Sequence, residues 1–243
     1  MSTRDFSTLV NEISPSVPGC PYPMIVSHIR NAAIRACERT LAWRHQVPTF
    51  PLQPNVQQYV YSKPEGTDVH AVFDAYVNNK PLRRLTLDQM IGKLRRENGN
   101  LYNLLLENGG AMLNENGTEF LGDGNDTFET GEPANMYQVT PDKFAVYPIP
   151  DDQRSYEVVM FLALKPKRTA DGMDAVMFDE LQDVIIHGAL QHLLVMPNKN
   201  WMDRELASYH AKQYIFHLSE RRARANLGTV RGVMTAVMQP FGA

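Results

Sequence analysis

Cysteine is scarce in this sequence, and its two cysteines are not placed as a metal site would need. The 243 residues contain only Cys20 and Cys37, and neither belongs to a CxxC pair or to a Cys/His cluster of metal-ligand spacing. A chain of this length can bury a sizeable core without disulfides or structural metals. We therefore expect both residues to be reduced, buried thiols.

Excess charge and long apolar runs are also missing. The chain has 24 basic and 27 acidic residues, a formal net charge of −3, so no overall basic field exists to bind nucleic acid non-specifically. No stretch approaches the length of a membrane span, and the N-terminal MSTRDFSTLV lacks an apolar signal region. We expect a soluble protein made in the cytoplasm, with no membrane partner.

Motifs of catalysis and cofactor binding are absent from the sequence as well. There is no HExxH, GxSxG, GxxxxGK or strand-linked GxGxxG, and the spacing of His187 and His192 directs them to different sides of a helix. The acidic segment GDGNDTFETGE at 122–132 has Phe128 where an EF-hand requires glycine, which favours a solvated loop. The sequence thus predicts no enzyme, no catalytic residue, no cofactor and no metal.

Helical periodicity is the clearest positive signal, above all in residues 24–46. At 100° per residue, one arc collects apolar and small side chains: Ile25, Ile29, Ala32, Ala33, Ala36, Thr40 and Trp43. Alanine at positions 32 and 36 predicts the close approach of another helix. Ile34 and Leu41 lie on the opposite side, where a monomer normally carries charge, and they indicate a second contact surface.

Residues 47–172 have the character of a small antiparallel β domain. After a proline-rich stretch, alternation predicts a strand ending at Tyr61, and a hairpin over 69–86 turns at Asn78 and Asn79, whose side chains tolerate positive φ. A short helix is predicted at 87–96, and three strands follow in MYQVT, KFAVYPI and SYEVVMFLALK. Short strands and long loops are assigned to the Asn- and Gly-rich residues 98–132.

Helices return at residues 174–196 and 201–224. The first has one apolar face, made of Phe178, Leu181, Ile185, Ala189 and Leu193. The second has two apolar stripes on roughly opposite sides, one of Met202, Leu206, Tyr209 and Phe216 and the other of Ala207, Ala211, Tyr214, Ile215 and Leu218. The predicted fold is α+β: an antiparallel helical bundle from residues 1–46 and 173–226, an inserted β domain at 47–172 and an extended C-terminal tail at 227–243.

A basic run closes the last helix and continues into the tail. Arg221, Arg222 and Arg224 complement the helix dipole, and Arg231 follows. A solvated helix end and a docking or DNA-facing role are both compatible with this run. The tail also carries apolar residues, among them Val233, Val237 and Phe241, with no evident core to join.

Five segments carry a resemblance when they are taken together. They are PGCP at 18–21, IRNAAIRACERTLAWR at 29–44, the step into the strand that ends at Tyr61, YPIPDDQRSYEVVMFLALKP at 147–166, and GALQHLLVMPNKNWMDRELASYH at 188–210. In this spaced pattern the chain resembles the head-to-tail adaptor proteins of short-tailed bacteriophages over residues 13–214. The resemblance implies a structural protein of the virion, located at the head-tail junction. It also implies a ring of identical subunits, usually twelve, between the portal protein and the tail nozzle protein, with DNA passing through the ring.

The two-faced helices and the apolar tail agree with such an assembly. We hypothesise that four off-face residues contact neighbouring subunits: Ile34, Leu41, Tyr214 and Leu218. We also expect the tail and the basic run to dock on the portal through Arg221, Arg222, Arg224, Arg231, Val233, Val237 and Phe241.

Two other classes stay open on the sequence alone. A small hydrolase or nuclease would need a convergent polar pocket, for which no spacing is evident. A carbohydrate-binding module could use four aromatic residues of the β domain, Tyr59, Tyr61, Phe73 and Tyr76.

Overall fold

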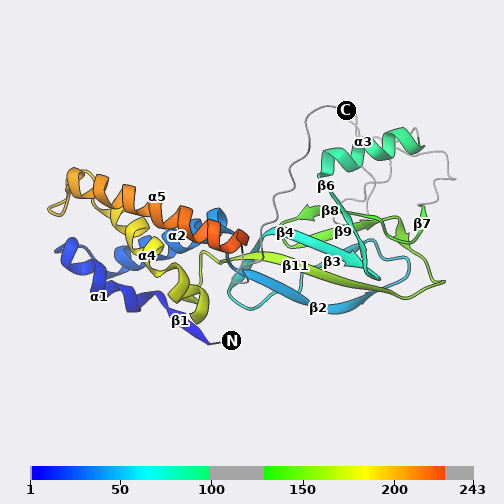
Figure 1. The fold of residues 1–243 in the computed structure, drawn as a ribbon, viewed down its shortest axis with the longest axis horizontal. Coiled ribbons are helices and arrows are strands. Elements are labelled where there is room, and N and C mark those ends of the chain that lie inside the picture. The colour runs from blue at the N-terminus through cyan, green and yellow to red at the C-terminus, as the bar shows by residue number, and fades with distance from the viewer. Residues whose placement is uncertain (1, 99–128, 228–243) are drawn as a thin grey trace, which may run out of the picture. The chain divides into compact units, whose positions relative to one another are not determined.

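The computed structural model of this chain describes residues 2–98 and 129–227. The chain forms two compact units, one comprising Met1–Trp43 and Lys165–Ala243 and the other Arg44–Leu164. Long helices make up most of the first unit and strands most of the second (Figure 1), so the fold class is α+β, as predicted. The sequence placed the β insertion at residues 47–172, so both predicted ends lie C-terminal to the ends of the second unit, Arg44 and Leu164.

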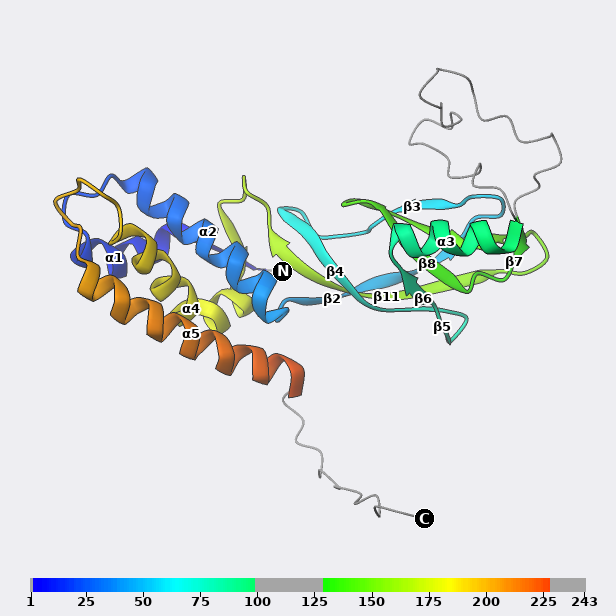
Figure 2. The same ribbon diagram turned by 90° about the horizontal axis from the view of Figure 1, so that it is seen from above.

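Three long helices pack against one another in the helical unit. They are α2 (Tyr22–Thr40), α4 (Ala175–Leu193) and α5 (Arg204–Leu227), which lie side by side in Figures 1 and 2. Before them the chain forms β1 (Thr3–Asp5), η1 (Phe6–Leu9), α1 (Val10–Ile13) and η2 (Ser14–Ser16). Strand β1 pairs antiparallel with β12 (Gly172–Asp174). Asp174 then begins α4, because its carboxylate accepts hydrogen bonds from the backbone N–H groups of Val176 and Met177.

The apolar faces predicted on residues 24–46 and 174–196 form the core of the helical unit. All seven residues of the arc at positions 25–43 are buried, and so are the five residues of the face on α4. The predicted close approach at Ala32 occurs opposite Gly188 of α4. A Cβ placed on Gly188 would lie 3.1 Å from the Cβ of Ala32, so the absence of a side chain at position 188 allows this contact.

Helix α2 ends earlier than predicted. Helix α2 stops at Thr40 because Leu41 takes a left-handed conformation with φ of 54°, and its N–H donates to the carbonyl of Cys37 at 2.9 Å. The prediction that the helix continues to Gln46 is wrong, since β2 (Arg44–Leu52) has already begun before that residue. Leu41 is half buried at the end of α2, so its apolar side chain is partly covered by residues of its own chain.

Two four-stranded sheets make up most of the β unit. The strand order of one is β2, β11 (Tyr156–Pro166), β4 (Thr67–Val77) and β5 (Lys80–Pro81). The order of the other is β3 (Gln58–Val60), β9 (Lys143–Tyr147), β8 (Asn135–Thr140) and β6 (Arg83–Leu85). The predicted hairpin is confirmed: β4 and β5 pair across Asn78 and Asn79, whose φ angles are 47° and 66°.

The β unit is not wholly antiparallel, which corrects the predicted architecture. Strands β6 and β8 run parallel, as do β7 (Thr130–Gly131) and β10 (Ile149–Pro150). Parallel neighbours need a crossover connection, and helix α3 (Leu87–Asn98), which confirms the helix predicted at 87–96, lies on the path from β6 to β8. It packs on β8 (Figure 2), where Met90 shares a buried cluster with Tyr137 and Ala145. Most of the loops and strands predicted at 98–132 fall outside the described residues.

Candidate functional site

The outer face of α5 is the most apolar exposed surface of a helix in the described chain. Three large side chains on it, Tyr209, Ile215 and Phe216, are 53%, 64% and 61% exposed. On the opposite side of the same helix Ala207, His210 and Tyr214 are buried. A helix of a monomeric protein normally places charged and polar groups on its outward side. We call Tyr209, Ile215 and Phe216 the α5 outer face.

The two apolar stripes predicted on α5 do not match its inward and outward sides. Ile215 was grouped with Ala207 and Tyr214, yet it is exposed like Tyr209 and Phe216 of the other stripe. Tyr214 was expected to contact a neighbouring subunit, yet it is only 6% exposed within one chain, and its ring would lie 3.1 Å from a Cβ on Gly188. Tyr214 is therefore a core residue. Leu218 is half buried at the border of the outer face.

Ile34 also has surroundings within its own chain. It lies on α2 between Arg30 and Glu38, one helical turn from each, so the three side chains share one side of the helix. Arg30 bonds to the Asp171 carboxylate at 3.2 Å, and Glu38 pairs with Lys165 at 2.7 Å. The segment from Lys165 to Asp171 therefore runs along this side of α2. The half-burial of Ile34 is accounted for without a neighbouring subunit.

The basic run at the end of α5 is mostly engaged with α4. The Arg221 guanidinium lies 3.1 Å from a Glu180 carboxylate oxygen and 3.6 Å from one of Asp183, and Arg224 lies 3.4 Å from Glu180. Arg221 is partly buried as well, with a side chain 17% exposed. These pairs tie α5 to α4, while Arg222 points into solvent. The other predicted docking residues, Arg231, Val233, Val237 and Phe241, lie outside the described residues.

Of the four aromatic residues that a carbohydrate-binding module could use, Tyr61 is buried, and the other three are partly buried: Tyr59, Phe73 and Tyr76. Tyr59 and Tyr61 both stack on the buried ring of Phe144, with centroids 5.6 Å and 5.0 Å apart. Burial raises the pKa of Tyr61 to about 12. Phe73 is covered by the guanidinium of Arg44 at 4.6 Å from the ring centroid. Tyr59, Tyr61 and Phe73 thus have packing partners within the β unit.

The remaining polar candidates also have structural partners. Cys20 and Cys37 are free thiols, as expected, and burial raises the pKa of Cys37 to about 12. The expectation that Cys20 is buried is wrong, because this residue is partly exposed. His187 and His192 face different helices, as predicted: His187 contacts His210 of α5, and His192 contacts Arg35 of α2. Within residues 2–98 and 129–227, no cluster of three or more His, Cys, Asp or Glu side chains could hold a metal ion. No helix in those ranges is long and apolar enough to cross a membrane.

A comparison with protein-family models matches most of the chain. The family model described as SU10 adaptor protein matches residues 4–237, which include both parts of the helical unit and the whole β unit. No curated protein matches the chain.

Proposed function

This chain belongs to the SU10 adaptor protein family, a family of phage head-to-tail adaptors, and on that premise we propose that its copies close into a ring between portal and tail nozzle. Membership makes the chain a structural protein of the virion that interacts with portal and tail proteins. The proposal adds the ring itself, its twelve copies, and the passage of DNA through the lumen.

The α5 outer face is the observation that best supports a contact between copies. Fully burying one exposed Ile or Phe side chain contributes about 1.5–3 kcal/mol, and Tyr209, Ile215 and Phe216 project from one helix that is already anchored on its other side. A ring of identical subunits needs a heterologous contact, in which this face meets a different surface of the next copy. Leu218 borders the face and belongs to the proposed contact.

Portal docking is proposed for the C-terminal segment together with the free end of α5. Arg221 and Arg224 already pair with α4, so Arg222 and Arg231 are the arginines assigned to portal carboxylates. Val233, Val237 and Phe241 would fill pockets while the backbone adds to a sheet edge. Ordering such a segment costs about 1–2 kcal/mol per residue, and binding through many copies at once offsets weak single contacts.

Passage of DNA without sequence-specific binding is consistent with the charge of the chain. A net charge of −3 provides little non-specific attraction for phosphates. A ring lumen with little attraction for phosphates would let the DNA duplex slide through without binding it tightly.

Assembly of the full-length chain on portal-bearing heads tests the proposal. The wild type is expected to attach as a closed ring, visible by electron microscopy, whereas Phe216→Asp should stay unattached with an unchanged circular dichroism spectrum. Ser62→Asp, which adds the same charge at an exposed site of the β unit, is the matched control and should assemble. Failure of the wild type to form any ring on heads would overturn the proposed function. Normal assembly of Phe216→Asp would show that the α5 outer face is not the contact between copies, and the proposed ring would stand without it.

A further inference from the structure

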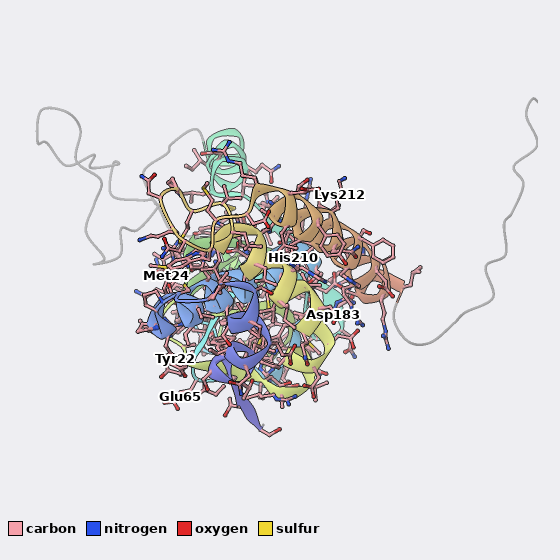
Figure 3. The ribbon with its side chains drawn as sticks, turned by 90° about the vertical axis from the view of Figure 1, so that its left-hand side faces the viewer. Tyr22, Met24, Glu65, Asp183, His210 and Lys212 are labelled. Carbon is pink, nitrogen blue, oxygen red and sulfur yellow. The ribbon has the colours of Figure 1, made fainter. Side chains whose placement is uncertain are left out.

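Three histidine side chains meet where α5 packs against α4. His187 of α4 contacts both His210 and His217 of α5. The Nδ1 atoms of His187 and His210 are 2.8 Å apart, and the rings of His187 and His217 stack with centroids 5.4 Å apart and planes 4° apart. Figure 3 shows His210 on the side of α5 toward α4, with Lys212 of the same helix on the far side. We call these three residues the histidine cluster.

The short contact between His187 and His210 depends on how many protons the pair holds. A neutral imidazole has one N–H, so one Nδ1 atom donates and the other accepts. When the pair gains one proton, one ring becomes a cation that donates from Nδ1, and the Nδ1 atom of the other, neutral ring can still accept. A second added proton leaves no acceptor, because both Nδ1 atoms then carry hydrogen and two cations face each other.

The acidic groups near the cluster are few and largely engaged. On α4, Asp183 lies one turn before His187, but Arg221 of α5 lies 3.6 Å from its carboxylate. Glu180 is held by both Arg221 and Arg224. On α5, Glu220 lies 3.8 Å from Nδ1 of His217.

Other groups packed around the cluster are uncharged or cationic. The rings of Tyr209 and Phe216 stand edge-on to His210 and His217. Helix α2 packs on both α4 and α5. From it, Arg35 contacts His192, beside which lies His28. Burial raises the pKa of Tyr214 on α5, and the positive charges of Arg39 and Arg35 oppose this rise. Positive charge from α2 thus acts on α4 at His192 and on α5 at Tyr214.

The directions of the histidine pKa values agree with this geometry. Burial lowers the pKa of His187. The neighbouring rings of His210 and His217 lower the pKa of His187 further, and Asp183 acts in the opposite direction. Burial also lowers the pKa of His210. A histidine whose folded pKa is below its unfolded value of about 6.5 adds full stability above that pH. This contribution is lost as the pH falls below about 6.5, because the unfolded chain then binds more protons.

We propose that the histidine cluster makes the contact between α4 and α5 proton-sensitive: the helices are held together while the His187–His210 pair carries at most one added proton, and they loosen when this pair takes a second. Arg221 still ties the end of α5 to α4, so loosening is centred on the turns from His210 to His217. These turns also carry Ile215 and Phe216, so acidification alters the helix that presents the α5 outer face. The inference concerns one chain and does not depend on ring formation.

Urea unfolding of the full-length chain at pH 7.5 and pH 5.0 tests the inference. Both tryptophans, Trp43 and Trp201, belong to the helical unit, so their fluorescence reports on it. His210→Gln keeps an N–H donor but cannot be protonated in this range, and His70→Gln removes an exposed histidine of β4 as a control. Each pKa unit by which a folded histidine is lowered raises the unfolding constant by up to roughly tenfold on acidification. The wild type and His70→Gln should show this loss fully, and His210→Gln should show a clearly smaller one. An equal loss in all three proteins would overturn the inference.

A measurement on the wild type covers the case in which His210→Gln does not fold. Imidazole carbon and proton signals followed by NMR should show His187 and His210 titrating in separate steps, with at least one step well below about pH 6.5. Independent titration of His187 and His210, both near that value, would equally overturn the inference.

Discussion

Replacing Gly188 by valine is expected to destabilise the helical unit by about 3 kcal/mol. Gly188 of α4 lies where α2 and α5 both approach. A Cβ at this position would lie 3.1 Å from the Cβ of Ala32 and 3.1 Å and 3.2 Å from two carbons of the Tyr214 ring. Carbon atoms in contact prefer separations of about 3.5–4.0 Å. Neither neighbour moves freely, because the Cβ of Ala32 is fixed by the α2 backbone and Tyr214 is buried.

The magnitude follows from two opposing effects. An alanine in a helix interior is favoured over glycine by about 1 kcal/mol, while forcing an extra group into a packed core costs about 1–3 kcal/mol. Gly188→Ala should therefore lose between about 0 and 2 kcal/mol. Valine adds two methyl groups beyond a Cβ that is already too close, and its branched side chain forfeits part of the helix gain. Its cost therefore lies at or above the upper end of the overpacking range.

Urea denaturation followed by tryptophan fluorescence measures these losses. Gly92→Ala in α3, where a Cβ would meet no atom within 4 Å, is the control and should not be destabilised. The expected order of stability is wild type, then Gly188→Ala, then Gly188→Val. If Gly188→Val were as stable as the wild type, α2, α4 and α5 could not meet at Gly188 as described.

Four further predictions cover the helix cap, the outer face, the tail and the histidines. Asp174→Ala should cost about 1 kcal/mol in urea unfolding, because it removes the acceptor for two N–H groups of α4, whereas Asp174→Asn should restore most of that stability. Phe216→Asp should abolish ring assembly on heads while leaving the circular dichroism spectrum unchanged. Deleting residues 229–243 should leave the fold intact and abolish attachment to portal-bearing heads, and unchanged affinity would exclude the tail as the anchor. His210→Gln should reduce the acid-induced loss of stability, as measured by the pair of unfolding curves at pH 7.5 and pH 5.0.

Periodicity identified which residues share a helix face, and this part of the sequence prediction was reliable. The arc from Ile25 to Trp43 and the face from Phe178 to Leu193 are buried as expected. On α5 the same reasoning found two stripes but assigned Tyr214 to the outward one and grouped Ile215 with it, whereas Tyr214 is buried and Ile215 is exposed. Both stripes are apolar, and the choice depends on Tyr214 fitting beside Gly188, a residue on another helix. That information is tertiary and is not contained in the periodicity of α5.

The remaining differences have equally local causes. Trp43 fits the helical arc of α2, but a left-handed Leu41 ends the helix before it, and Trp43 is still buried. Prolines at 48 and 51 concealed strand β2, which tolerates them because it lies at the edge of its sheet. The arginines at the end of α5 pair with acidic residues some forty positions earlier, and the histidine cluster joins two helices. Neither arrangement leaves a local pattern in the sequence.

Electron cryomicroscopy of the full-length chain bound to its portal tests the central claim most directly. The account predicts a closed ring of identical subunits, twelve in number, with Tyr209, Ile215 and Phe216 of each copy buried against the next and with an open central channel. Single copies bound separately to the portal, or a ring in which the α5 outer face remains in solvent, would contradict it.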